Sequence, residues 1–393
     1  MDGFPFMPWP GNKPVRRLRH LARRSMFAHH PRWRRWLLRA IMTLAWPVGA
    51  VWETVRCLRR MSDADRPAGP WGWVRRACHM LALAWIDNVP PRNHVMYRLH
   101  DPARHSRIGL CFYGAEIQAL TAHLNRLNGA AGQDVRDKAR FADLCRAHGM
   151  PCIPTLAVFR GGVQCVPLAP FLPDGPDLWV KDLAGSQGSG AARWQREGDT
   201  YRHAWQGGVC SLPVLVAQWR GRDCIIQPCL ENHPSLAPLS DGSLVVFRVI
   251  TGIDRGGRVA VIAALAQFPC GGVGAHQIFA SVGPQGDILI PRLRGLQPVT
   301  HHPDSGAGLP GTRVPFWPEA LDLVVRAHGG VPEFSRFVFL GWDVAITGEG
   351  PLLIETNAGW GAVNHQLGDG VLLGLTVMPT IALDHLEGPP PCG

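Results

Sequence analysis

The sequence predicts an α+β protein with a helical, basic N-terminal arm. From about residue 134 onward, short apolar runs of strand length alternate with turns that contain Gly or Pro, and a few helix-length segments lie between them. Hydrophobic residues make up 46% and charged residues 18% of the 393 residues, as in an ordinary globular protein. The net charge of +10 is concentrated near the N-terminus. A chain of this length is expected to form two or three domains.

The arm comprises residues 1–66 and carries the excess charge. Ten Lys and Arg residues and no acid occur between Lys13 and Arg39, so the rest of the chain is formally neutral. Because the basicity does not belong to the folded body, no nucleic-acid partner is expected. A charge-free apolar stretch follows at residues 40–52 and is interrupted by Pro47. It is shorter than the roughly 20 residues that a spanning helix needs.

Two interpretations of the arm remain open. Its helical face packs on the protein's own body while the arginines reach toward water. Alternatively, residues 13–52 dock on an anionic membrane surface, with Trp rings at headgroup depth. Eleven cysteines without a C-x-x-C pair indicate neither a disulfide framework nor a zinc site, so a reduced, cytoplasmic setting is expected. In the second interpretation the protein is peripheral at the inner face of the membrane.

Three further regions follow the arm. Asp, Pro and Gly cluster at residues 63–70 as in a linker, and residues 67–133 form a helical or mixed region. Two subdomains are expected over residues 134–232 and 233–393. Helical spacing predicts a helix over residues 137–148, ended by Gly149 and Pro151. Composition and length predict strands over residues 178–181, 224–227, 244–251, 259–266, 341–346 and 352–355.

A glycine-rich loop follows the first of these strands. The strand ends in Lys181, and the next residues include Gly185, Ser186, Gly188 and Gly190. Glycines allow backbone N–H groups to converge on phosphate oxygens without obstruction by Cβ atoms. The order differs from that of a P-loop, in which Gly-Lys-Ser/Thr follows the glycines. The pattern therefore indicates a phosphate-binding loop, and its alternative is a glycine-rich hairpin tip.

The last two predicted strands form a hairpin that carries oxygen ligands. The tight turn between them brings Asp343 beside Glu355, and the alternation of side chains places Asn357 on the same face as Glu355. Such oxygen donors suit Mg²⁺ bound to phosphates. An acidic hairpin surface is the alternative, but both carboxylates lie in otherwise apolar strands, where an unpaired charge is costly.

These motifs occur in the order found in the ATP-grasp superfamily. The order is Lys138 in DKARF, the Lys181 strand with its loop, the strand IIQPCL, Arg248 in FRV, and the metal hairpin. The amino-acid sequences of residues 227–239 and 341–345 resemble those of the sugar-transfer-associated ATP-grasp branch. The resemblance covers roughly residues 75–370. It implies a fold in which two α/β subdomains clasp ATP between antiparallel sheets.

The resemblance also implies roles for individual residues. Lys138 and Lys181 would contact the ATP phosphates, and the glycine loop would close over them. Arg248 would steady the γ-phosphate and an acyl phosphate. Asp343 and Glu355 would bind Mg²⁺, with Glu355 bridging two ions and Asn357 completing the second.

The adenine hinge would comprise Gln227, Pro228 and Leu230. Pro228 would accept a hydrogen bond from the adenine amino group through its carbonyl, and Leu230 would donate its N–H to the ring. Proline suits the first position because no N–H is needed there. Asp182 departs from the family pattern, since a proline often follows the lysine.

The function implied is that of an ATP- and Mg²⁺-dependent ligase. It would activate a small-molecule carboxylate as an acyl phosphate and couple it to an amine or another nucleophile, in cell-envelope polysaccharide or secondary-metabolite biosynthesis. The sequence identifies neither substrate. Two alternatives remain: an ATP-grasp phosphotransferase that acts on a hydroxyl, and a nucleotide-binding partner of a glycosyltransferase without turnover of its own.

Overall fold

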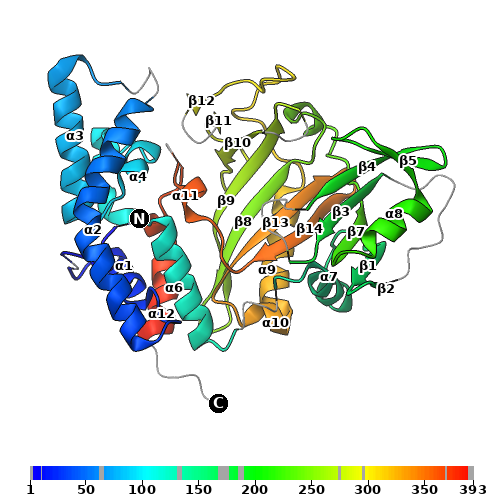
Figure 1. Ribbon diagram of the computed structural model, residues 1–393, viewed down its shortest axis with the longest axis horizontal. Helices are drawn as coiled ribbons and strands as arrows, with labels where there is room; N and C mark the ends of the chain where they lie inside the picture. The colour runs from blue at the N-terminus through cyan, green and yellow to red at the C-terminus, as the bar shows by residue number, and fades with distance from the viewer. Residues whose placement is uncertain are drawn as a thin grey trace.

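Two antiparallel sheets and a layer of helices make up the protein (Figure 1). The computed structural model describes residues 3–9, 11–61, 66–130, 135–166, 177–184, 190–272, 276–293, 297–367 and 370–387. Within these ranges each sheet has seven strands. The first sheet has the order β2-β1-β7-β3-β4-β5-β6, and the second has the order β12-β11-β10-β9-β8-β13-β14. The predicted α+β class is confirmed.

The helical layer lies beside the second sheet, on the side away from the first (Figure 1). Its helices are α1 (Pro14–Ser25), α2 (Arg32–Arg59), α3 (Gly69–Ile86), α4 (Pro91–Met96), α5 (Pro102–His105), α6 (Gly114–Leu127) and the C-terminal α12 (Met378–Glu387). Val15, Leu18 and Ala22 recur every three to four residues on α1 and are buried in one cluster with residues of α6, α12 and the second sheet. The predicted C-terminal subdomain thus ends in a helix that packs against the arm.

Two arginines of α1 are buried in an ionic cluster. Arg19 donates hydrogen bonds to both carboxylate oxygens of Glu116 on α6, at 2.8 and 3.0 Å, and Arg23 donates to one of them at 2.9 Å. The side chains of all three residues are at most 1% exposed. The face of α1 packs on the protein's own body, as in the first of the two interpretations, but these two guanidinium groups are buried and do not reach toward water. No helix in the described ranges has the length and apolarity needed to cross a membrane.

The first sheet carries the residues expected to bind ATP. Its strands are β1 (Ala157–Arg160), β2 (Val163–Val166), β3 (Leu178–Asp182), β4 (Ala192–Glu197), β5 (Thr200–His203), β6 (Val209–Ser211) and β7 (Cys224–Pro228). Helix α8 (Leu212–Trp219) packs Leu215 and Trp219 on one face. Helix α7 (Lys138–Ala147) confirms the helix predicted over residues 137–148. Its N-cap is Asp137, whose side chain accepts hydrogen bonds from two backbone N–H groups.

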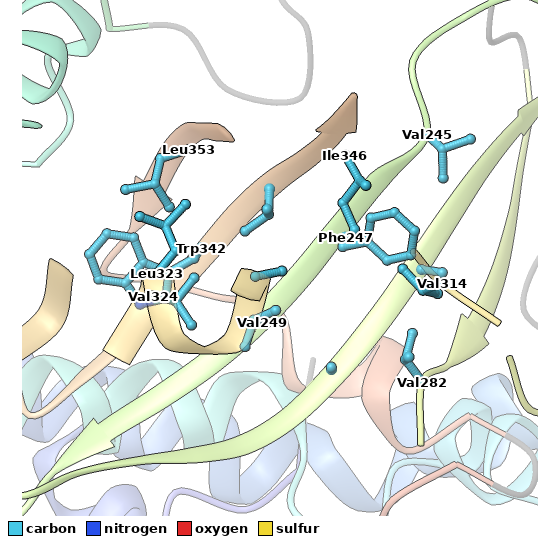
Figure 2. Close-up of a cluster of buried hydrophobic side chains, with 14 of the residues drawn as sticks. Val245, Phe247, Val249, Val282, Val314, Leu323, Val324, Trp342, Ile346 and Leu353 are labelled. Atoms are coloured by element: carbon cyan, nitrogen blue, oxygen red, sulfur yellow. The ribbon is translucent and has the colours of Figure 1, made fainter. Parts of the chain in front are cut away.

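The second sheet is formed by long strands with one face buried. Its strands are β8 (Val246–Ile253), β9 (Val259–Cys270), β10 (His276–Ser281), β11 (Arg292–Leu293), β12 (Gln297–Pro298), β13 (Phe339–Thr347) and β14 (Gly350–Asn357). Helices α9 (Trp317–Gly330) and α10 (Pro332–Ser335) cover that face. Figure 2 shows Leu323 and Val324 of α9 beside Trp342, Val249 and Leu353 of the sheet. This core holds the opposite face, where the polar residues lie, in a fixed geometry.

The observed strand bounds differ from the predicted ones, most clearly in β8 and β9. Strand β8 begins two residues later than expected and ends two residues later. Strand β9 was expected to end at residue 266, but it continues to Cys270 because Gln267 through Cys270 pair with β10. The predicted strands over residues 178–181, 224–227, 341–346 and 352–355 all lie within observed strands.

Candidate nucleotide and metal site

The metal hairpin has the register that its sequence predicts. Asp343 of β13 lies directly opposite Glu355 of β14, and Gly341 lies opposite Asn357. The alternation of a strand puts all three oxygen donors on one face, and the Asn357 amide donates to Glu355 Oε1 at 3.4 Å. Asp343 is 7% exposed. The structure therefore brings together the three residues proposed to bind metal.

Arg248 joins this hairpin from the neighbouring strand. It lies opposite Asp343 in the β8–β13 pairing and donates from Nε and a terminal nitrogen to the two Asp343 oxygens, at 2.7 and 2.6 Å. Burial raises the pKa of Asp343, and Arg248 opposes that shift only in part. Burial lowers the pKa of Arg248, but Asp343 outweighs this effect and the net shift is upward. The pair therefore keeps the guanidinium charged and fixed at the site.

Two lysines reach the hairpin from the other side. Lys138, at the start of α7, has its Nζ 3.8 Å from Glu355 Oε2, and its side chain is 10% exposed. Lys181, near the end of β3, interacts electrostatically with Glu355, Lys138 and Asp343. Burial is the main cause that lowers the pKa of Lys181 to about 8, from an ordinary value of 10.5. Lys138, Lys181 and Arg248 thus converge on the Asp343–Glu355 pair.

Only the end of the glycine loop lies within the described residues. Gly185, Ser186 and Gly188 lie outside them. Gly190 has a φ of +66°, and a Cβ atom there would collide with the Asp182 carboxylate. Arg222 pairs with Asp182 and donates to the Gly190 carbonyl at 2.7 Å. The departure at Asp182 therefore has a structural role, because it ties the base of the loop to the sheet.

The proposed adenine hinge lies at the end of β7. Gln227 is opposite Trp179, and Ile225 is opposite Lys181, so Gln227 and Lys181 share one face of the first sheet. Gln227 is 3% exposed, and its side-chain oxygen has no hydrogen-bond partner in the part of the chain that the structure describes. Pro228 and Leu230 follow along the chain and are partly buried. A buried acceptor without a partner fits a ligand that brings a donor.

A row of paired residues extends from the metal hairpin across the second sheet. Glu355 pairs with Asp343, Asp343 with Arg248, Arg248 with Leu265, and Leu265 with Ser281. Paired residues of antiparallel strands point to the same face. The far end of the row lines a cavity of about 300 Å³ whose wall is mainly apolar. The cavity is lined by Leu265, Phe279, Ser281, Ile288, Leu289, Ile290, Arg292, Pro310, Asn364, Leu367 and Gly370.

His365 is a residue that the sequence motifs do not indicate. It lies in α11 (Ala362–His365), is fully buried, and has no hydrogen-bond partner on either ring nitrogen among the described residues. Burial, followed by the nearby Arg248 charge, lowers the pKa of His365 to about 3, so the ring is neutral at physiological pH. A single histidine in the sequence does not form a motif with the residue spacing typical of a metal or catalytic site. Only its position eight residues after Asn357 could have drawn attention to it.

The charges and donors fit a nucleotide with its metal. Three cationic side chains face two carboxylates, which leaves a net charge of +1 before a ligand binds. Within the described residues, no group of three or more His, Cys, Asp or Glu side chains could hold a metal ion by itself. Mg²⁺ commonly uses one or two carboxylates together with phosphate oxygens and water. The donor set of Asp343, Glu355 and Asn357 therefore fits Mg²⁺ that arrives with ATP phosphates.

Comparisons with solved structures give distant matches. An L-amino acid ligase from Bacillus licheniformis is 12% identical over 64% of this chain and 48% of its own, with a TM-score of 0.38. The D-alanine-D-alanine ligase of Helicobacter pylori is 10% identical over 64% of this chain and 61% of its own, with a TM-score of 0.37. The match thus spans about half of the first protein, and likeness at this level does not identify a substrate. No curated protein matches the chain at a significant level.

The match to a family model is more extensive. The model described as sugar-transfer associated ATP-grasp matches residues 120–377, about two thirds of the chain. The matched range includes Lys138, Lys181, Arg248 and the metal hairpin, which the fold brings to one place. ATP-grasp membership supports an ATP-dependent, ligase-like enzyme. The chain therefore belongs to the sugar-transfer-associated ATP-grasp family.

Proposed function

We propose that the protein uses ATP to activate a carboxylate as an acyl phosphate and then transfers the acyl group to an amine. The observation that carries this proposal is the paired row from Glu355 through Arg248 to Ser281. In this row one guanidinium lies between the oxygen donors that we propose for Mg²⁺ and a mainly apolar cavity on the same face. A phosphoryl group bound at one end would therefore lie beside an acid bound at the other.

In the first step, an oxygen of the acid attacks the γ-phosphorus and the bond to the β,γ-bridging oxygen breaks, which releases ADP. Two anions must approach each other, so most of the catalytic effect comes from charge neutralisation and in-line positioning. Lys138, at the start of α7, and Lys181, on the first sheet, would face the phosphates from one side, and Arg248 would face them from the second sheet. Mg²⁺, held by Asp343, Glu355 and Asn357, would offset the charge of the phosphate oxygens.

In the second step, the nitrogen of an amine attacks the acyl carbon, and inorganic phosphate leaves with one oxygen of the original acid. The acyl phosphate must be protected from water. Most side chains of the cavity wall are apolar, which would help to exclude water once the substrates fill the cavity. Ser281, Arg292 and Asn364 are its polar members and would orient the acid. The expected acid is small and mainly apolar, since a cavity of about 300 Å³ is at the lower end for ligand sites.

The test is an ADP-release screen over pooled carboxylic acids and amines, followed by mass spectrometry of the positive pools. A positive acid is then supplied with ¹⁸O in its carboxylate. We expect one labelled oxygen in the released phosphate and an amide product. A stable phosphoester with no label in free phosphate would establish a phosphotransferase instead, and label in AMP would establish adenylation. ATP binding without turnover in any pool would favour a role as a nucleotide-binding partner.

A matched pair of variants links the activity to this site. Arg248→Met removes the guanidinium that lies between the phosphates and the cavity, and we expect at least a hundredfold loss of ADP release. Arg258→Met is the control, because its side chain is 90% exposed at the far end of the same sheet. Equal activity of both variants would contradict the assignment of Arg248.

A further inference from the structure

Helix α2 has an apolar face that points away from the protein. Its members are spaced three and four residues apart, and each is between 42% and 79% exposed: Trp33, Leu37, Ile41, Leu44, Val48, Val51, Trp52 and Val55. At about 100° per residue, they lie within an arc of roughly 100° along some 33 Å of helix. We call this set the outward face of α2. A helix on a protein surface normally has polar residues there, so this arrangement is inverted.

The opposite side of α2 is occupied by contacts within the protein. Trp46, Ala50 and Thr54 are buried, and the Trp46 indole donates to the Ala84 carbonyl of α3 at 3.1 Å. Trp46, Ala50 and Ala84 form one buried cluster. The outward face therefore cannot turn inward without breaking this packing. Figure 1 shows α2 and α3 at the edge of the molecule farthest from the first sheet.

The neighbouring helix adds more exposed apolar side chains. Trp71 is 84% exposed on α3, and Val74, Trp85 and Ile86 are between 40% and 51% exposed. Trp36 of α2 is 76% exposed. Soluble monomers rarely expose so many large apolar residues on adjacent elements, and such a surface marks an interaction site. Trp is the side chain that prefers the boundary between hydrocarbon and lipid headgroups.

The charge around this surface identifies the partner. Residues 11–61 contain thirteen Lys and Arg residues and a single acid, Glu53. Glu53 lies next to Arg92, and its side chain is 17% exposed. Arg32 and Arg34 flank one end of the outward face, and Arg56 and Arg59 flank the other. The partner must therefore be anionic as well as apolar.

We propose that the outward face of α2, with the exposed tryptophans of α3, docks on an anionic lipid bilayer and lies in its interfacial plane. The apolar residues would enter the headgroup boundary while the flanking arginines contact lipid phosphates. A second copy of the chain fits less well, because it would bring these arginines against one another, and within the described residues 11–61 Glu53 is the single acid. Pro47 also interrupts the helical hydrogen bonding that a long paired helix requires. The nucleotide site, which lies between the sheets, stays in water.

Deletion of the whole arm is not a suitable test of this proposal. Deletion of the arm would remove Arg19 and Arg23 and leave Glu116 buried without its partners. Point substitutions on the outward face avoid this damage. Leu44→Glu with Val48→Glu places two acids at positions that are 79% and 72% exposed. The matched control is Val163→Glu with Val209→Glu, which makes the same chemical change at positions 64% and 49% exposed on the first sheet.

The experiment measures co-sedimentation of the full-length protein with vesicles that contain phosphatidylglycerol, and with vesicles of phosphatidylcholine alone. We expect wild type and the control variant to bind the anionic vesicles, with binding that weakens as salt rises. The Leu44→Glu/Val48→Glu variant should bind at least tenfold more weakly while its circular dichroism and ATP affinity stay unchanged. Brominated lipid should quench the tryptophan fluorescence of wild type, which gives a readout that needs no variant.

Three results would overturn the proposal. The first is absence of wild-type binding to anionic vesicles, and the second is equal binding by the outward-face and control variants. The third is a wild-type dimer in analytical ultracentrifugation that becomes a monomer in the Leu44→Glu/Val48→Glu variant without any vesicle binding. That result would assign the outward face to self-association.

Discussion

ATP binding is expected to weaken as the pH rises through 8, because Lys181 loses its proton there. Burial lowers the pKa of this side chain to about 8, and Glu355 opposes the shift without cancelling it. In the nucleotide-free protein, roughly 75% of Lys181 is charged at pH 7.5 and roughly 3% at pH 9.5. If only the charged form holds the phosphates, affinity falls about twentyfold between these values. A charge-assisted hydrogen bond contributes about 1.5–3 kcal/mol, so its loss is large enough to account for this decrease in affinity.

The measurement is the dissociation constant of Mg·ATP by calorimetry from pH 7.5 to 9.5, for wild type and for Lys181→Arg. The arginine keeps its charge over this whole range, so its affinity should be nearly independent of pH even if it is lower overall. Parallel curves for the two proteins would refute the assignment, because the loss would then come from another group. A flat wild-type curve would refute it as well.

The same pKa makes a prediction about stability. The unfolded chain holds a proton on Lys181 up to its ordinary value of 10.5, whereas the folded protein releases it near 8. The unfolded state therefore binds more protons between these values, and stability contributed by this residue rises with pH across that window. At pH 7 the buried charge opposes folding. Lys181→Met should thus melt at a higher temperature than wild type without nucleotide, and should lose most of the stabilisation by ATP.

Three further substitutions test other parts of the structure. Glu355→Gln keeps the side-chain volume but removes an anionic ligand. We therefore expect loss of turnover and weaker Mg²⁺ dependence, with an unchanged circular dichroism spectrum. Turnover within tenfold of wild type would contradict the metal assignment. Glu116→Gln leaves two buried arginines without a counter-charge, so it should reduce the free energy of unfolding, measured in urea, by about 3–5 kcal/mol. The control Glu319→Gln, on the exposed side of α9, should change this free energy little. His365→Phe removes a buried ring whose nitrogens have no hydrogen-bond partner among the described residues, so the free protein should melt at a higher temperature in calorimetry. A lower melting temperature would contradict this expectation.

Local patterns in the sequence are sufficient to predict the parts of the site that are built by residues close together in the chain. The hairpin of Asp343, Glu355 and Asn357 could be predicted because a tight turn and strict alternation determine which side chains share a face. The helix that starts at Lys138 could be predicted from its apolar spacing and from Gly149 and Pro151, which follow it. Strands such as β2 and β6 are not predicted because four and three residues are too few to show a clear apolar run or alternation.

Contacts between distant segments were decided by the tertiary structure. Arg248 and Asp343 are 95 residues apart, and they meet because β8 pairs with β13 in a register that no local pattern specifies. Likewise, 97 residues separate Arg19 from Glu116. Arginine usually remains at the surface, so the sequence indicated a charged arm, and only the position of a buried carboxylate on α6 shows that part of it belongs to the core. For α2 the apolar spacing predicts an apolar face. Whether the protein covers that face depends on which side of the helix packs inward, and the long-range packing of Trp46 and Ala50 with Ala84 of α3 determines this.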